Sequence, residues 1–337
     1  MTRSGHASDV STSSMPSSAH YNLGPLPWSD DDLVAAVWKS FTQAQEWVDE
    51  HPGRAFVARL ESLWAVRRIF EGSAEQFNEC LARFHAEAQG GHLFRRNRRS
   101  DLDAYEQQFQ KLLYVFASSA MTLVDQSRAL SQKVTLPDYE AHVSAAFATN
   151  PRHRLVQELR VDVIHVTLHR PGWQLTSGRD EEPTSKFMLW PNQLTRLPDY
   201  NVQARQFVEK HPKGIDLGRL IADYSAEVRE FHEWLQQTTE DAVGHMMDDY
   251  QRCMKRIKSV SSRSFWNLIF QQVVIAGKRD PYTYLDQYLT EGELSEVNAL
   301  PHRSRRQIDR IIELVDEYEA CDDELRQIIY KAFDASA

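Results

Sequence analysis

Most of the chain repeats its large apolar side chains every three or four positions, which is the spacing of one face of a helix. In the longest such segment the stripe includes Leu220, Tyr224, Phe231 and Leu235, with charged residues between them. The same spacing predicts helices over about 30–48, 54–71, 73–89, 101–133, 151–171, 199–211, 215–258, 263–276 and 303–333. The expected fold class is therefore mainly α, a helical bundle.

Two features interrupt this helical pattern. Gly72 and Ser73 separate two apolar stripes, so we expect one helix to end there and another to begin. Between Trp173 and Trp190 the apolar residues fall in two short runs on either side of a polar loop. These runs predict a pair of strands, a small β-hairpin-like insertion at about 172–190.

The pattern also suggests how the chain is divided. Residues 1–27 are rich in Ser and contain almost no large apolar group before Tyr21, so a disordered tail is expected there. We expect a helical bundle domain with the hairpin insertion over 28–260. The remaining residues, 261–337, predict a smaller C-terminal helical part packed on the bundle.

Composition narrows the function classes. With 337 residues and a formal charge of −9, the chain can bury a large core but has no general attraction for nucleic acid. Its three cysteines are far apart, which fits neither a disulfide framework nor a zinc site. No apolar run approaches the roughly 18 residues of a membrane-spanning helix, and no signal-peptide core is present. We therefore expect a cytoplasmic protein that does not interact with membranes.

One predicted helix gathers more reactive side chains than any other. Residues 151–171 read PRHRLVQELRVDVIHVTLHRP and contain Arg160, Asp162 and His165. At about 100° per residue, the Arg and the His lie roughly 140° apart and can flank one groove. An imidazole can transfer protons near neutral pH, a guanidinium can hold a phosphate, and a carboxylate can orient the imidazole. Such a set suits cleavage of RNA by its own 2′-hydroxyl, without a metal or other cofactor.

The Arg-x4-His spacing on a long helix resembles the signature of the HEPN superfamily, an Arg followed after four to six residues by a His. Many members of that family are metal-independent endoribonucleases of toxin–antitoxin or antiviral defence systems, and they usually form homodimers with a composite site. The resemblance implies that Arg160 and His165 are catalytic and that the partners are RNA, a second copy of the chain, and an antitoxin or defence-complex protein. Val161 departs from the family pattern, in which a polar residue commonly follows the Arg, and Asp162 lies one position further on.

Two other interpretations of the same residues stay open. In the first, Arg160 pairs with a carboxylate such as Glu158, His165 is a half-buried structural residue, and the protein is a non-catalytic helical adaptor. In the second, His165 and His169 bind Zn²⁺, because residues four apart share one helix face. Two ligands do not complete a zinc site, so no metal is expected.

A basic cluster precedes the predicted helix at 101–133. It consists of Arg95, Arg96, Arg98 and Arg99. These side chains are candidate RNA-binding residues, because Lys and Arg neutralise phosphates. The alternative is a solvated loop in which the arginines pair with nearby acids.

Overall fold

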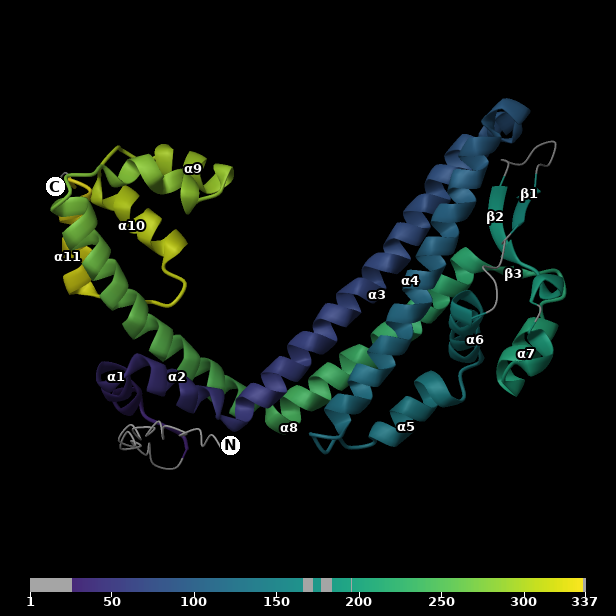
Figure 1. The fold of residues 1–337 in the computed structure, drawn as a ribbon, viewed down its shortest axis with the longest axis horizontal. Coiled ribbons are helices and arrows are strands. Elements are labelled where there is room, and N and C mark those ends of the chain that lie inside the picture. The colour runs from purple at the N-terminus through teal and green to yellow at the C-terminus, as the bar shows by residue number, and fades with distance from the viewer. Residues whose placement is uncertain (1–25, 166–171, 177–183, 195, 336–337) are drawn as a thin grey trace, which may run out of the picture. The chain divides into compact units, whose positions relative to one another are not determined.

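The computed structural model describes residues 26–165, 172–176, 184–194 and 196–335. It is mainly helical with a small three-stranded antiparallel sheet, which confirms the expected fold class (Figure 1). The predicted tail at 1–27 lies outside the described residues, except for Leu26 and Pro27. None of the described helices is long and apolar enough to cross a membrane.

The described helices and strands follow one another along the chain with few long connections. The α-helices are α1 Asp30–Lys39, α2 Phe41–Asp49, α3 Pro52–Ala88, α4 Arg99–Ser131, α5 Tyr139–Val143, α6 Pro151–His165, α7 Val202–Glu209, α8 Leu217–Leu268, α9 Glu291–Asn298, α10 Arg305–Val315 and α11 Asp323–Ala332. The strands are β1 Gly172–Thr176, β2 Thr184–Leu189 and β3 Ile215–Asp216. Short 3-10 segments lie at Gln89–Phe94, Arg96–Arg98, Pro191–Gln193, Leu197–Asp199 and Pro281–Gln287, and π-helical turns at Ser144–Ala148 and Ile269–Ile275.

Contacts divide the chain into two compact units. The first, here called the bundle unit, runs from His51 to Tyr250. The second, here called the terminal unit, combines the residues up to Glu50 with Gln251–Ala337. The expected boundaries at 28 and 260 place residues 28–50 with the bundle, whereas the contacts group them with the C-terminal residues.

The bundle unit is built around a long hairpin of α3 and α4. Phe70 stacks on Phe116 with ring centroids 5.0 Å apart, and both are 1% exposed. The helix α3 continues through Gly72 and Ser73, so the predicted break there is wrong. Ser73 is buried and its hydroxyl donates to the carbonyl of Phe70 at 2.7 Å, a local bond that a helix tolerates.

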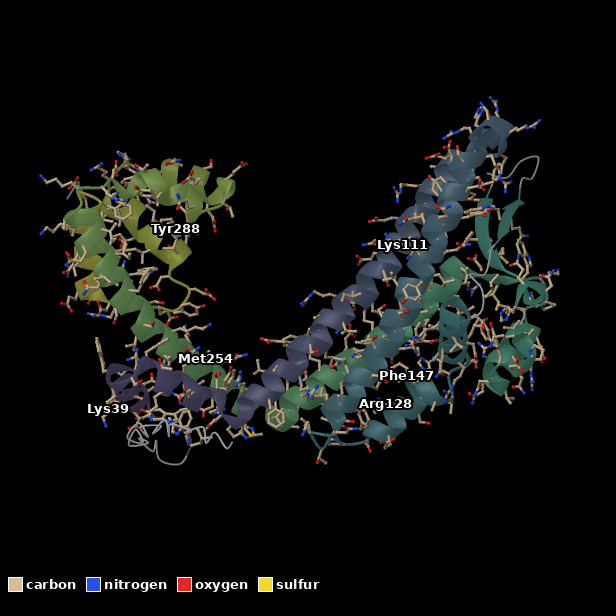
Figure 2. All side chains as sticks on the ribbon, viewed as in Figure 1. Lys39, Lys111, Arg128, Phe147, Met254 and Tyr288 are labelled. Atoms are coloured by element: carbon tan, nitrogen blue, oxygen red, sulfur yellow. The ribbon has the colours of Figure 1, made fainter. Side chains whose placement is uncertain are left out.

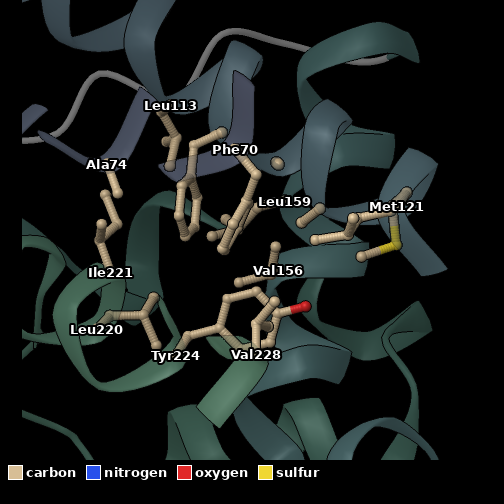
Figure 3. Packing of buried hydrophobic residues seen from close by; sticks show 14 of the residues in the cluster. Phe70, Ala74, Leu113, Met121, Val156, Leu159, Leu220, Ile221, Tyr224 and Val228 are labelled. Atoms are coloured by element: carbon tan, nitrogen blue, oxygen red, sulfur yellow. The ribbon is translucent and has the colours of Figure 1, made fainter. Parts of the chain in front are cut away.

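The helices α6 and α8 complete the core of the bundle unit. Figure 3 shows Val156 and Leu159 of α6 packed in the same buried cluster as Leu113 of α4 and Tyr224 of α8. The hydroxyl of Tyr224 lies 2.8 Å from Nδ1 of buried His153. Burial lowers the pKa of this imidazole to about 4, because charging it away from water is costly.

The sheet covers one end of the hairpin. β1 and β2 pair antiparallel from Gly172↔Met188 to Thr176↔Thr184, which confirms the hairpin-like insertion. The short strand β3, which the sequence pattern did not indicate, extends the sheet by pairing Ile215 with Leu189. Trp173 stacks on Phe84 of α3 with centroids 3.5 Å apart, so the aromatic face of the insertion is buried against the helices.

The terminal unit has its own small core. The residues of this core come from the π-helical turn after α8, from the 3-10 segment that follows it, and from the last three helices and their ends. They are Val274, Leu285, Leu289, Val297, Ile308, Ile311, Ile312, Leu325, Ile329, Ala332 and Phe333. Two predicted helices are divided in this unit. Ser40 ends α1 and caps α2, and the residues between Val315 and Asp323 separate α10 from α11.

Candidate functional site

The candidate helix α6 is fixed at its first turn. Asn150 caps it, because its side-chain oxygen accepts the main-chain N–H of Arg152 at 2.9 Å and of His153 at 3.3 Å. The side chains of Asn150 and Arg152 also donate to Glu227 of α8, each at 2.7 Å. The start of the helix is therefore attached to α8 by a charged network as well as by its apolar face.

Asp162 is buried near the other end of α6. Its side chain is 1% exposed, and one carboxylate oxygen accepts a hydrogen bond of 2.7 Å from Nη1 of Arg196. The other oxygen accepts the hydroxyl proton of Tyr200. A buried carboxylate is stable only with such partners, so Asp162 holds α6 to the segment that precedes α7.

The ionisation of the partners reflects this pairing. Burial raises the pKa of Tyr200, and the hydrogen bond to the Asp162 carboxylate raises it further, so the tyrosine acts as a neutral donor. The hydrogen bond that Arg196 itself donates to Asp162 is the main cause that raises the pKa of Arg196.

Glu158 is occupied in a similar way. Its Oε1 accepts the main-chain N–H of Asn201 at 2.8 Å, and its other oxygen lies 3.7 Å from Arg196. Glu158 and Asp162 are four residues apart on α6, so they share the face that meets the 196–201 segment. This arrangement commits both acids that neighbour Arg160 in sequence to other partners.

Arg160 is exposed. It lies two residues from each of the two acids, which is a rotation of about 200° and places it on the opposite face of the helix. Within the described part of the chain its guanidinium makes no ion pair. The structure therefore does not bring Arg160 and Asp162 together, and it leaves the guanidinium accessible to a ligand.

The predicted histidines lie at the limit of the described chain. His165 is the last residue of α6, and its side chain lies outside what the structure describes. His169, the second member of the predicted zinc pair, lies outside the described residues altogether.

The basic cluster lies at the turn between α3 and α4. Arg98 donates to Asp101 at 2.6 Å and to Glu87 at 3.3 Å, and Arg99 donates to Asp103 at 3.2 Å. Arg95 and Arg96 are exposed and form no ion pair with any described residue. Two arginines of the cluster are thus occupied by acids, and two are accessible.

The cluster and α6 lie apart along the bundle. In Figure 1 the turn between α3 and α4 lies at one end of the hairpin, whereas α6 packs against α4 away from that turn. An RNA that contacts both places must span this separation.

The partners of Asp162 were not found by sequence reasoning. Arg196 and Tyr200 lie in an irregular segment between the sheet and α7, where no periodicity indicates that they are neighbours of Asp162. The signal that points to them is Asp162 itself, since a carboxylate on the packed side of a helix requires a cation or several hydrogen-bond donors.

Together, the fold and this site define a mainly helical protein with a small antiparallel sheet and an exposed arginine on an anchored helix. Comparison with known proteins adds no relative: no family model matches the chain, and neither a curated protein nor a solved structure matches it.

Proposed function

We propose that this protein is a metal-independent endoribonuclease of the HEPN-like type. Arg160 binds the scissile phosphate, and His165 transfers the proton. The observation that supports this role is the exposed guanidinium of Arg160, whose neighbouring acids Glu158 and Asp162 are bonded elsewhere. A guanidinium without a counter-ion among the described residues is ready to bind an external anion.

The proposed reaction uses the RNA as its own nucleophile. The 2′-oxygen attacks phosphorus while its proton passes to the imidazole of His165, and the bond from phosphorus to the 5′-oxygen breaks. The leaving oxygen takes a proton from a second imidazole, supplied in its protonated form by another copy of the chain. The products are a 2′,3′-cyclic phosphate and a 5′-hydroxyl, so no water, metal or cofactor is consumed.

Arg160 stabilises the charge that builds on the phosphate oxygens during the attack. Asp162 contributes as a positioning residue, because its bonds to Arg196 and Tyr200 hold the end of α6 on which His165 lies. The setting we propose is the cytoplasm of a bacterium, with an antitoxin or defence-complex protein as regulatory partner. Two copies forming a composite site would appear as a dimer in light scattering at micromolar concentration, whereas a strict monomer would contradict that part of the proposal.

The direct test is cleavage of a structured RNA in the presence of EDTA. The wild type should release fragments with 2′,3′-cyclic phosphate ends, and Arg160→Ala and His165→Ala should each lower the rate by at least ~100-fold. The matched control is Arg219→Ala, which removes an 81% exposed arginine from α8 and should leave the rate unchanged. Intact RNA with the wild type, or equal rates for wild type and Arg160→Ala, would rule out this site.

The adaptor function, which is the alternative, predicts a different effect of Arg160→Ala on the stability of the protein. If Arg160 were structural, Arg160→Ala would lower the melting temperature. Removal of an exposed arginine without an ion pair should change the free energy of unfolding by less than about 0.5 kcal/mol. A thermal melt therefore separates the two functions independently of any activity assay.

A further inference from the structure

The terminal unit contains an open apolar cavity of ≈ 450 Å³. Its floor is formed by buried residues of the unit's core, among them Leu285, Ile312 and Phe333. Its rim carries Phe265, which is 60% exposed, and Tyr288, which is 71% exposed and stands on the surface of this unit in Figure 2. The whole lining belongs to the last part of α8 and the residues that follow it, so the cavity lies within one unit.

The exposed aromatic rings at the opening of this cavity form an unusual feature for the surface of a helical unit. Two large aromatic rings at one opening expose more apolar surface than scattered single residues do, and concave apolar sites of this volume are typical of small-molecule binding. The volume falls within the range of about 300–1,000 Å³ found for ligand pockets. A ligand with a hydrocarbon chain would remove these rings from water.

One charged side chain joins the apolar lining. Arg279 follows the π-helical turn at the end of α8 and is exposed. The adjacent acid, Asp280, is bonded to Arg303 at 3.2 Å and to the main-chain N–H of Tyr282 at 3.1 Å. Within the described chain Arg279 makes no ion pair, so its guanidinium lies at an apolar cavity without a counter-ion.

From this juxtaposition we infer that the terminal unit binds a free single-chain carboxylate, with the hydrocarbon chain in the cavity and the carboxylate on Arg279. A guanidinium binds a carboxylate through two parallel N–H···O bonds, and the apolar walls select the chain. The inference uses none of the residues of the proposed ribonuclease site, so either can fail alone.

The test is isothermal titration of the full-length protein with dodecanoate and with the neutral amphiphile octyl glucoside, both below their micelle concentrations. We expect saturable binding of dodecanoate by the wild type and about tenfold weaker binding by Arg279→Gln, with octyl glucoside binding unchanged in that variant. Lys278→Gln, which alters the adjacent cation outside the lining, is the matched control and should bind like the wild type.

A second variant tests the cavity rather than the charge. Val273 is 38% exposed at the lining, and Val273→Trp should fill the cavity and remove the binding of both amphiphiles while the circular dichroism spectrum stays that of the wild type. Absence of saturable dodecanoate binding by the wild type, or equal binding by Arg279→Gln, would overturn the inference. If the wild type sedimented with anionic lipid vesicles and Val273→Trp did not, the occupant would be a membrane surface and the inference would be overturned. A change of oligomeric state in Val273→Trp would also overturn it, because the cavity would then be a protein interface.

Discussion

The guanidinium of Arg196 donates a hydrogen bond of 2.7 Å to the carboxylate of Asp162, which is 1% exposed. This ion pair joins the end of α6 to an irregular segment 34 residues further along the chain. Because the acid is buried and the arginine is 25% exposed, the pair belongs to the class of largely buried ion pairs, in which the loss of one partner is destabilising.

Removal of the cation should therefore destabilise the protein. Arg196→Leu should lower the free energy of unfolding by about 2 kcal/mol, less than for a fully buried pair because Arg196 is partly solvated. Tyr200→Phe, which removes the second donor to Asp162, should cost roughly 1–2 kcal/mol. Urea denaturation measures both, and a double-mutant cycle gives their coupling.

A surface ion pair on α7 provides the control for this prediction. Arg205 lies 4.0 Å from Glu209, and both side chains are well exposed. Arg205→Leu should change stability by no more than about 0.5 kcal/mol. Equal effects of Arg196→Leu and Arg205→Leu would show that Asp162 does not depend on its cation.

Two glycines of α3 should respond in opposite directions to replacement by alanine. A Cβ on Gly53 would lie 2.1 Å from the carbonyl oxygen of Met246 and 2.8 Å from Cβ of Tyr250, so Gly53→Ala forces α3 and α8 apart. We expect a loss of about 2 kcal/mol. A Cβ on Gly72 meets nothing within 4 Å, so Gly72→Ala should stabilise the helix by about 0.5–1 kcal/mol. Thermal or urea unfolding of the two variants measures both signs, and destabilisation by Gly72→Ala would contradict this account of the helix.

Two buried histidines should make stability depend on pH. Burial lowers the pKa of His153 to about 4 and that of His232 to about 3, whereas in the unfolded chain both lie near 6.5. Below pH 6.5 the unfolded state therefore binds more protons than the folded state. The free energy of unfolding should fall as the pH drops from 6.5 toward 4, by up to about 1.4 kcal/mol per pH unit for each histidine.

His232 allows this pH dependence to be isolated. Its side chain is buried, and neither ring nitrogen has a hydrogen-bond partner among the described residues. His232→Leu should therefore reduce the slope of stability against pH, measured by urea denaturation between pH 7 and 5.5, above the range where most carboxylates titrate. An unchanged slope would mean that His232 does not contribute to it.

The basic cluster between α3 and α4 should affect RNA binding unequally. Arg95 and Arg96 are accessible, so the double variant Arg95→Gln/Arg96→Gln should weaken binding and reduce the slope of log affinity against log salt by about 1.4 for single-stranded RNA. Arg98→Gln/Arg99→Gln should have a smaller effect, because these side chains already pair with acids. Fluorescence anisotropy at several salt concentrations measures both, and equal effects of the two double variants would contradict this assignment.

Part of the site was predictable and part was not. The apolar face of α6 follows from the spacing of Leu155, Val156 and Leu159, and at 100° per residue Arg160 lies at the edge of that face, about 90° from its centre. Helix geometry also separates Arg160 from Asp162 by about 200°. The partner of Asp162 could not be predicted, because Arg196 reaches it through a turn of irregular structure that no periodic pattern describes.

By itself, the sequence determined the helical character of the chain and the strand pair near residues 172–190, because apolar spacing is a local property that each segment carries. Only the tertiary structure decided that α3 runs unbroken through Gly72, that Glu158 and Asp162 are both occupied, and that Arg160 and Arg279 are left without counter-ions within the described chain. Those outcomes depend on which residues far apart in the sequence become neighbours. Which charged groups pair, and which faces pack, is determined only when the helices come together.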